Sequence, residues 1–477
     1  MKLRGTIGVS SLIVFFAFSV TTQAQSLKQA IQQTINENPE IQSAKSERLA
    51  VEQQISQARA SYFPTIDIQA GYGWEQSNNT STRARGDGTA SFSREEASIQ
   101  LRQMVFDGLA TPSEVNRQEA RTNSKAYTVF GQAEITALNA VEAYLNVMRN
   151  QELVKLAKDN LLIHKKINNQ ISLRSESGIG RQADTEQAMA RLALAERNTL
   201  AEVGNLRDTE TAFLRVIGSL PGDLEEVAEP QDALPENLDQ AVEQAIANHP
   251  ILKSANAEID SAFAQHDTAR AAYMPRLDIE AGATHNNDLD GVQGKDEDVT
   301  VMLQFRYNLF NGGKDVARRR ETAELINQSK DVRDNTYRQV VESMRLSWVA
   351  HQTVKRQMNF FKAHQDASIK TNLAYQKQFD IGQRTLLDLL DSANEMFIAK
   401  SSYTSARYDV IFSQYRILTS KGALNHYMDI SLPDEATPLN TKPKDSIDNA
   451  PQPVEGQMNI HQVEAASRHV ETKNTIQ

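Results

Sequence analysis

Cysteine is absent from the 477 residues of this chain. No disulfide framework can therefore hold the fold together, although export from the cytoplasm normally permits one. A bacterial lipoprotein carries its lipid on an N-terminal cysteine, so this form of membrane anchor is excluded. Aromatic residues make up only 6% of the chain, whereas aromatic side chains usually dominate core burial. A thick globular core is not expected.

Long apolar runs are also lacking, except at the start of the chain. Lys2 and Arg4 precede an apolar stretch over 7–20, and small residues follow up to Ala24. This order predicts a secretory signal over residues 1–24 that is cleaved after Ala24, with an uncleaved anchor as the alternative. No other run approaches ~20 apolar residues, so we expect no membrane-spanning helix in the mature chain.

Clustered charge of one sign and catalytic signatures are missing as well. The net charge is −10 and the lysines and arginines are scattered, which argues against nucleic acid as a partner. No HExxH, P-loop, GxSxG or clustered metal-ligand pattern occurs, and the nine histidines are dispersed. We therefore expect neither an enzyme nor a bound cofactor or metal.

The sequence does contain an internal duplication. Ala58-Arg-Ala-Ser-Tyr-Phe-Pro64 recurs as Ala269-Arg-Ala-Ala-Tyr-Met-Pro275, at an offset of 211 residues. Val105-Phe-Asp-Gly108 recurs as Leu309-Phe-Asn-Gly312, at an offset of 204. The change in offset between two matched blocks indicates a difference in loop length within a duplicated chain.

The duplication predicts a first structural repeat over residues 25–237, a second over 238–430, and a polar tail over 431–477 that is largely disordered or wraps loosely on the periplasmic surface. In each repeat we expect helices, then a pair of strands, then long helices. These elements span 26–62, 64–106 and 113–217 in the first repeat, and 238–273, 275–310 and 315–421 in the second.

The predicted strands alternate between apolar and polar residues, which is typical of a strand with two different faces. The clearest apolar series comprises Val299, Val301, Leu303, Phe305, Tyr307 and Leu309. Aromatic residues on the apolar faces could form an interfacial belt or pack at the junction with the helices; they are Tyr72, Trp74, Phe305 and Tyr307. The alternative to membrane strands is a soluble strand pair packed on helices.

Strands of about ten residues with one apolar face suit a membrane barrel that has lipid outside and water inside. Four strands cannot close, however, and an open sheet edge in lipid leaves backbone groups without hydrogen bonds. The chain must therefore share its barrel with copies of itself. Two copies would supply eight strands and three copies twelve.

The predicted long helices are the other unusual feature. From Ser113 to Ser177 there is no proline and one glycine, and from Asp315 to Phe379 there is neither. Each stretch could span about 100 Å as one helix, with several shorter helices as the alternative. A coiled-coil seam is predicted from Tyr337, Val341, Met344 and Trp348. Such narrow seams are stable when helices pack side by side, as in a tunnel wall.

Four segments give the chain a family resemblance. They are Leu101-Arg-Gln-Met-Val-Phe-Asp-Gly108, Ser177-Gly-Ile-Gly-Arg-Gln-Ala-Asp184, Tyr307-Asn-Leu-Phe-Asn-Gly-Gly313 and Gln378-Phe-Asp-Ile-Gly-Gln-Arg-Thr-Leu-Leu-Asp-Leu-Leu-Asp391. With the duplicated plan, they make residues 26–430 resemble the TolC family of outer-membrane channel proteins. The last segment looks like the branch that serves type I secretion, including the export of large adhesins.

The resemblance implies a fold that is mainly helical with a membrane barrel. Three chains would form a homotrimer with a shared twelve-stranded barrel in the outer membrane and a coiled-coil tunnel in the periplasm. A periplasmic adaptor and an inner-membrane ABC transporter would open the tunnel for exported protein cargo. A multidrug efflux duct is the alternative within the family, and a periplasmic adaptor is the alternative outside it.

Control is predicted at the turns that follow the long helices. Gly178 and Gly382 lie where these helices should end, consistent with C-terminal caps. Asp388 and Asp391 are three residues apart and share one helix face. Three chains would bring six such carboxylates towards one axis, where they would attract cations. Ordinary first-turn acids, favoured by the helix dipole, are the alternative.

The resemblance adds roles for three further residues at this periplasmic gate. It implies that Arg384 pairs with Asp184 of the first repeat and helps to keep the tip shut. Phe379 occupies the position of an aromatic residue that elsewhere in the family is a hydrogen-bonding tyrosine. Phenylalanine cannot make that bond, so its role here is open.

Overall fold

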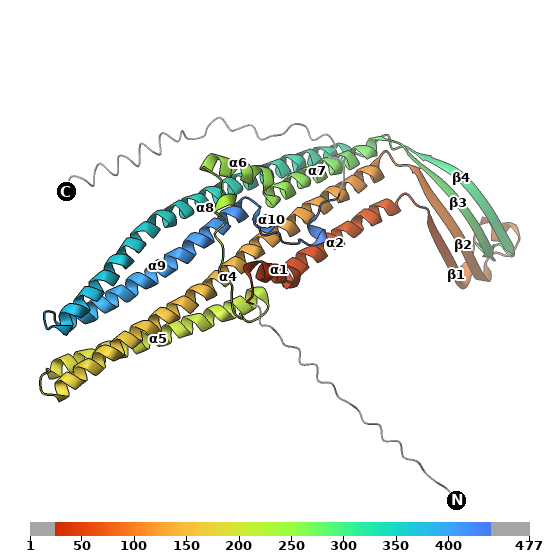
Figure 1. Ribbon diagram of the computed structural model, residues 1–477. Coiled ribbons are helices and arrows are strands. Elements are labelled where there is room, and N and C mark those ends of the chain that lie inside the picture. Colours follow the sequence, from red (N-terminus) through yellow and green to blue (C-terminus); the bar gives the residue numbers. More distant parts are fainter. Residues whose placement is uncertain (1–23, 440–477) are drawn as a thin grey trace, which may run out of the picture.

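A computed structural model describes residues 24–439 of the chain. The predicted signal segment before Ala24 lies outside the described residues, as does the predicted tail beyond Leu439. The described part is elongated, with helices running to one end and a four-stranded sheet at the other (Figure 1).

Apart from α3, which only the first half has, the helices and strands of the described residues follow the same order in both halves. The first half contains α1 (Leu27–Glu37), α2 (Pro39–Ala60), β1 (Thr65–Ser77), α3 (Thr80–Ala84), β2 (Ala90–Phe106), α4 (Ala110–Glu176) and α5 (Gln182–Ile217). The second contains α6 (Leu238–Asn248), α7 (Pro250–Arg270), β3 (Arg276–Asn287), β4 (Lys295–Arg306), α8 (Lys314–Asp380) and α9 (Leu386–Ser420). Short turns η1 (Gln231–Ala233), η2 (Ala271–Tyr273), α10 (Leu424–Tyr427) and η3 (Asp434–Ala436) complete the chain.

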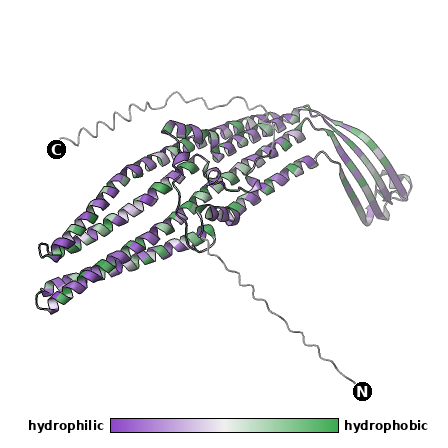
Figure 2. Ribbon diagram, in the orientation of Figure 1, coloured by the Kyte–Doolittle hydropathy of each residue, from purple (hydrophilic) through white to green (hydrophobic). Residues whose placement is uncertain are grey.

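The strands form one antiparallel sheet in the order β1-β2-β3-β4. The helices next to the sheet keep the same order, because each is continuous with one strand: α2 packs on α4, α4 on α7, and α7 on α8. The long helices then turn back as two hairpins, α4 with α5 and α8 with α9. Hydrophilic and hydrophobic residues are interspersed along all of these helices (Figure 2).

The first helices of both repeats are interrupted at the same place. The side chain of Asn38 accepts the N–H of Glu40 at 2.9 Å and caps α2. His249 caps α7 in the second repeat, and Pro39 and Pro250 each take the first helical position. Proline is suited to this position because its missing N–H would have no helical partner there.

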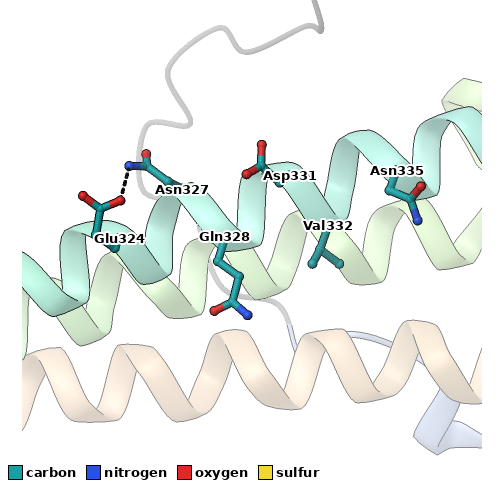
Figure 3. A pocket seen from close by; sticks show the side chains of 6 residues that line it. All are labelled: Glu324, Asn327, Gln328, Asp331, Val332 and Asn335. Carbon is teal, nitrogen blue, oxygen red and sulfur yellow. Dashed lines mark hydrogen bonds between the residues drawn. The ribbon is translucent and has the colours of Figure 1, made fainter.

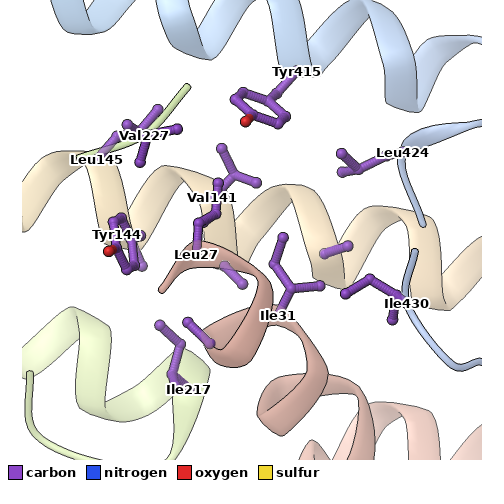
Figure 4. Packing of buried hydrophobic residues seen from close by; sticks show 14 of the residues in the cluster. Leu27, Ile31, Val141, Tyr144, Leu145, Ile217, Val227, Tyr415, Leu424 and Ile430 are labelled. Carbon is purple, nitrogen blue, oxygen red and sulfur yellow. The ribbon is translucent and has the colours of Figure 1, made fainter. Parts of the chain in front are cut away.

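The main apolar core lies at mid-length, where α4 meets α1 and the ends of α5 and α9 (Figure 4). The hydroxyl of Tyr144 on α4 lies 2.7 Å from the carbonyl oxygen of Gln25 and 2.8 Å from that of Glu225. Fully buried members include Ile31, Phe213, Leu418 and Leu424. Each buried side chain of this size contributes ~1.5–3 kcal/mol, so this core fixes the two repeats to each other.

The buried line of α8 differs from the predicted seam by about one residue. It comprises Thr336, Val340, Met344, Ser347 and His351. Of the predicted residues, Met344 is fully buried, whereas the other three are only partly buried. Ser347 and His351 lie on this line because they contact Ser420 and Ser413 of α9, each at 2.9 Å. An apolar pattern could not reveal this polar contact between helices.

Strand β4 ends before the point that alternation predicted. Tyr307 and Leu309 were expected on its apolar face, but the strand ends at Arg306. The Asn308 side chain accepts the N–H of Phe310 at 3.0 Å and starts a turn. Gly313, with φ of 83°, completes the turn into α8. Alternation continued in the sequence, whereas strand pairing did not.

The first residues of the predicted tail are packed on the helices, so for them disorder is wrong and the alternative, a wrap on the surface, applies. The N–H of Ser431 donates to the side chain of Gln32 at 2.8 Å, and Ala436 is buried. The N–H of Leu439 donates to the Asn123 side chain at 2.6 Å. These short contacts with α1 and α4 hold residues 431–439 against the helices.

Candidate functional site: the two-faced sheet and the helical tips

The sheet has one apolar and one polar face across all four strands. One row across the sheet runs Ile68, Ile99, Ala283 and Val299, from β1 to β4. The adjacent row, on the other face, runs Asp67, Gln100, Gly282 and Thr300. Ile68 is 76% exposed and Val299 82% exposed, so nothing within residues 24–439 covers these positions of the apolar face.

Aromatic residues mark both ends of the apolar face. Tyr72 and Trp74 lie towards the loop end of β1 and are exposed. Phe305 lies at the helix end of β4, and Tyr307 lies just beyond that strand. Aromatic girdles at both water interfaces flank the apolar band of a membrane barrel. A belt with Tyr72 and Trp74 at one rim and Phe305 at the other stays a prediction, beside the alternative of packing at the junction with the helices.

A charged network ties the strands together at the helix end of the polar face. Arg102 of β2 contacts Glu280 of β3 at 3.0 Å, and Arg276 contacts Asp278 at 2.8 Å. Arg306 of β4 contacts both carboxylates. The Asp278 side chain is fully buried, and a buried carboxylate requires such partners.

At the opposite end of the molecule, both long helices stop at the predicted glycines. Gly178 follows α4 with φ of 73°, and Gly382 follows α8 with φ of 77°. The N–H groups of Gly382 and Gln383 donate to the carbonyls of Phe379 and Gln378, at 3.0 and 2.8 Å. The turn after α4 has the same pair of bonds. This is the Schellman motif, in which glycine is favoured because φ is positive.

Asp388 takes part in the N-terminal cap of α9. This is the role of an ordinary first-turn acid, which was the alternative to a carboxylate ring. Asp388 forms a capping box with Thr385, whose hydroxyl lies 2.8 Å from the carboxylate. This hydrogen bond, with one from the Thr385 N–H, holds the pKa of Asp388 below its usual value. The Arg384 guanidinium lies 3.8 Å from Asp388, 2.8 Å from the Gln378 side chain and 4.2 Å from the ring centre of Tyr375.

Asp391 has a different partner from Asp388. Its carboxylate accepts a hydrogen bond from Arg191 of α5 at 2.6 Å, so it links the two hairpins. Asp184 lies in the first turn of α5. Within residues 24–439, Arg384 contacts its own hairpin and not Asp184. The pairing of Arg384 with Asp184 stays a prediction, for contacts between chains.

Phe379 is buried in a small apolar cluster between the two hairpins. The cluster contains Ile167 and Ile171 of α4, Ala188 of α5, Phe379 of α8, and Leu386, Leu389 and Leu390 of α9. The Arg174 guanidinium lies 4.9 Å from the centre of the Phe379 ring, a favourable cation–π distance. Phe379 therefore acts here by packing, without needing the hydroxyl of a tyrosine.

Arg174, Arg191 and His164 were not predicted from the sequence. Burial and the nearby Arg191 guanidinium hold the pKa of His164 below its usual value. Arg191 lies seven residues after Asp184, two helical turns along one face, and this spacing was the available signal. It does not reveal that α5 lies beside α9.

A groove of about 460 Å³ lies along the first third of α8 (Figure 3). It is lined by Glu324, Asn327, Gln328, Asp331, Val332 and Asn335. All six residues come from one helix, and Val332 is the single apolar residue among them. An enzyme site normally has polar groups converging from several elements, which this groove lacks.

Across residues 24–439, no group of three or more histidine, cysteine or acidic residues could hold a metal ion. In the same part of the chain, no helix combines the length and the apolar character needed to cross a membrane.

A duplicated chain with a two-faced open sheet and two long helices of 67 residues, each about 100 Å long and each turning back into a hairpin, defines the class of outer-membrane export channels. The chain belongs to the outer membrane efflux protein family, which it matches over residues 30–219 and 241–423. This confirms the predicted family and the outer-membrane location.

Three relatives match most of the chain at low identity. Outer membrane efflux protein BepC of Brucella suis is 23% identical, covering 87% of this chain and 90% of BepC. Outer membrane protein TolC of Escherichia coli is 22% identical, covering 91% and 90%. Alkaline protease secretion protein AprF of Pseudomonas aeruginosa is 23% identical, covering 82% and 83%.

Solved structures share the same fold. The Campylobacter jejuni CmeC outer membrane channel matches with a TM-score of 0.71 at 15% identity, covering 89% of this chain and 94% of CmeC. A CusC structure matches with a TM-score of 0.72 at 14% identity, covering 83% and 92%. The predicted fold, mainly helical with a four-stranded membrane sheet in a duplicated chain, is confirmed.

Proposed function

We propose that three copies of the chain close their sheets into one barrel of twelve strands. The observation that carries this proposal is the free edge at each side of the sheet: β1 and β4 have one neighbouring strand each. Strand edges in lipid leave N–H and C=O groups unsatisfied, at a cost of several kcal/mol each. Pairing β1 of one chain with β4 of the next removes every edge.

In this barrel the apolar face, with Ile68 and Val299, contacts lipid, and the polar face lines a water-filled interior. The α4–α5 and α8–α9 hairpins extend the duct into the periplasm. Because these hairpins present narrow seams and polar outer surfaces, they form a hollow wall rather than a solid core. An adaptor and an inner-membrane ABC transporter dock at this end.

We further propose that the cargo is protein exported by type I secretion, such as a large adhesin. The segment Gln378 to Asp391 supports this branch by its resemblance, and AprF is named as a protease secretion protein. The alternative is the outer-membrane component of a drug efflux pump, supported by the name of BepC as an efflux protein.

Deletion of the gene distinguishes these functions when two readouts are taken from the same strain. We expect one or a few large proteins to disappear from the cell surface and medium, with drug susceptibility unchanged. Reintroducing the native gene should restore them. Increased drug susceptibility with unchanged secretion would overturn the secretion proposal in favour of efflux.

The proposed control point is the ring of helical tips. Phe379 and Asp391 hold the two hairpins of one chain together, whereas Asp184, Arg384 and Asp388 stay exposed or partly exposed at the tip, where a neighbouring chain can contact them in addition to their partners within the chain. Docking of the adaptor would separate these contacts and open the passage.

A further inference from the structure

The loops at the end of the sheet away from the helices pack on each other. One loop lies between β1 and β2 and contains α3; the other is residues 288–294, between β3 and β4. The side-chain amide of Asn79 donates to the carbonyl of Asp290 at 2.6 Å. Arg85 donates to the carbonyl of Gly291. The β3–β4 loop is therefore fixed to the neighbouring hairpin.

The strand register shows which face of the sheet this loop covers. β1 and β2 pair without a bulge from Thr65 to Ser77, so Glu75 and Ser77 lie on the polar face with Asp67. The Glu75 carboxylate accepts the N–H of Asp290 at 3.3 Å. Glu75 and Ser77 are partly covered, whereas Gln76, on the apolar face between them, is exposed. The loop lies across the polar face.

Gly291 is the point of closest approach. It is buried, its φ is +72°, and a Cβ there would lie 2.6 Å from Cγ2 of Thr82 and 2.9 Å from Cβ of Ser77. Gly88, in the other loop, also has a positive φ, +59°, but has nothing within 4 Å of a Cβ. Among the described glycines of these two loops, only Gly291 combines the left-handed backbone with close contact to the opposite loop.

We propose that the β3–β4 loop forms a constriction at the outer exit of the duct, and that Glu75, Asn79 and Gly291 are its positioning residues. The inference rests on the proposed trimeric barrel, in which the polar face lines the interior. A loop folded across that face projects over the opening, and three copies reduce its width. Releasing the loop widens the exit.

Single-channel conductance in planar bilayers tests the proposal on purified full-length trimers. Gly291→Ala should release the loop and raise conductance roughly twofold, because a wider mouth lowers the resistance of the pore. Gly88→Ala is the matched control, with the same backbone cost and no steric contact, and should conduct like the native protein. Equal conductance of all three proteins overturns the constriction. Absence of pores in the native protein would instead overturn the proposed barrel.

A reversible crosslink is a second test, which is needed if the Gly291→Ala protein does not assemble. The chain has no cysteine, and the Cβ positions at 77 and 291 are close enough for a disulfide after a small shift. In the pair Ser77→Cys and Gly291→Cys, oxidation should return conductance to the native level, and reduction should raise it. Gly291→Cys alone should stay high in both conditions. If the conductance of the double variant is the same before and after reduction of the disulfide, the proposal is overturned.

Discussion

Glu134 places a carboxylate in the buried interior of α4, opposite the short turn that follows α9. It is 2% exposed and accepts the N–H groups of Leu424 and Asn425, at 2.9 and 3.1 Å. Burial raises its pKa from 4.5 to about 7, and the two backbone hydrogen bonds oppose that rise. The folded protein therefore keeps a proton on Glu134 at pH values where the unfolded chain has released it.

This difference predicts a pH dependence of stability. Between pH 4.5 and about 7 the folded state binds the extra proton, so the free energy of unfolding falls as pH rises through this window. The contribution of this one group is on the order of 3 kcal/mol. Glu134→Gln should flatten the dependence, measured as the denaturant midpoint of the detergent-solubilised protein at pH 5 and pH 7.5. Glu142→Gln, at an exposed position on the same helix, should keep the native slope.

Arg384 should affect conduction more than stability. Within its chain it makes one exposed ion pair and contacts Tyr375 and Gln378, and exposed pairs contribute about 0–1 kcal/mol. We expect Arg384→Ala to leave thermal unfolding nearly unchanged and to raise single-channel conductance, because the implied contact with Asp184 is lost. Arg197→Ala, on an exposed face of α5, is the control.

One result would contradict a gating role for the residues at the helical tip. Unchanged conductance and unchanged cation block after joint replacement of Arg384, Asp388 and Asp391 would remove it. Asp388 would then be a helix cap and Asp391 a link to Arg191, the roles that their contacts within the chain already define.

The sequence located the tip but not its partners. Gly178 and Gly382 were predictable because a positive φ after a helix restricts the residue type. The pairing of Asp391 with Arg191 was not, since it depends on α5 lying beside α9, and no periodicity within either helix contains that information. Phe379 could be recognised as a departure, but its burial became visible only once the four helices were placed.

At the scale of helices and strands, the glycines at the two ends of the long helices meet different requirements. Gly382, after α8, has φ of +77° and nothing within 4 Å of a Cβ. Gly108, before α4, has φ of +72°, and a Cβ there would lie 2.7 Å from the carbonyl oxygen of Ala271 and 2.6 Å from Cβ of Met274. The first position needs only the backbone conformation, whereas the second also needs the space.

Substitution of these glycines should therefore give unequal losses. Gly382→Ala should cost about 1–2 kcal/mol for the left-handed backbone, and Gly382→Asn less. Gly108→Ala should cost clearly more, because η2 and the start of β3 must move. Thermal unfolding of the assembled protein measures both. Equal losses would mean that the junction between sheet and helices adapts freely.

The elements were predictable where one physical rule dominates. The long helices appear as single helices because no residue between Ser113 and Glu176, or between Asp315 and Phe379, breaks the hydrogen-bond ladder. The end of β4 was not predictable from alternation, since Tyr307 continues the apolar series after pairing with β3 has stopped. The buried line of α8 differs from the predicted seam because two polar residues, Ser347 and His351, face α9.

At the scale of the whole molecule, the duplication is visible in the sequence, and the order of helices and strands could be predicted from the duplication. Two matched halves predict two strand pairs, and the structure joins them edge to edge through β2 and β3. What one chain cannot specify is the contact between chains, because the register of β1 against β4 of a neighbour has no counterpart within it. That contact decides whether the duct exists.

Crosslinking across the free edges tests the assembly directly. The chain has no cysteine, so Ile68→Cys in β1 and Val301→Cys in β4 place one thiol on each edge, near mid-strand on the apolar face. In the assembled double variant, a short bis-maleimide should join neighbouring chains into covalent dimers and trimers that survive boiling in detergent.

Each single variant provides one edge and should give no covalent trimer. A pair inside the sheet, Ile99→Cys with Ala283→Cys on neighbouring strands β2 and β3, should react within one chain and stay monomeric. A ladder that ends at the trimer means that three sheets close on themselves, because every β1 has then found a β4. A ladder that ends at the dimer would indicate eight strands, and a duct too narrow for a protein exporter.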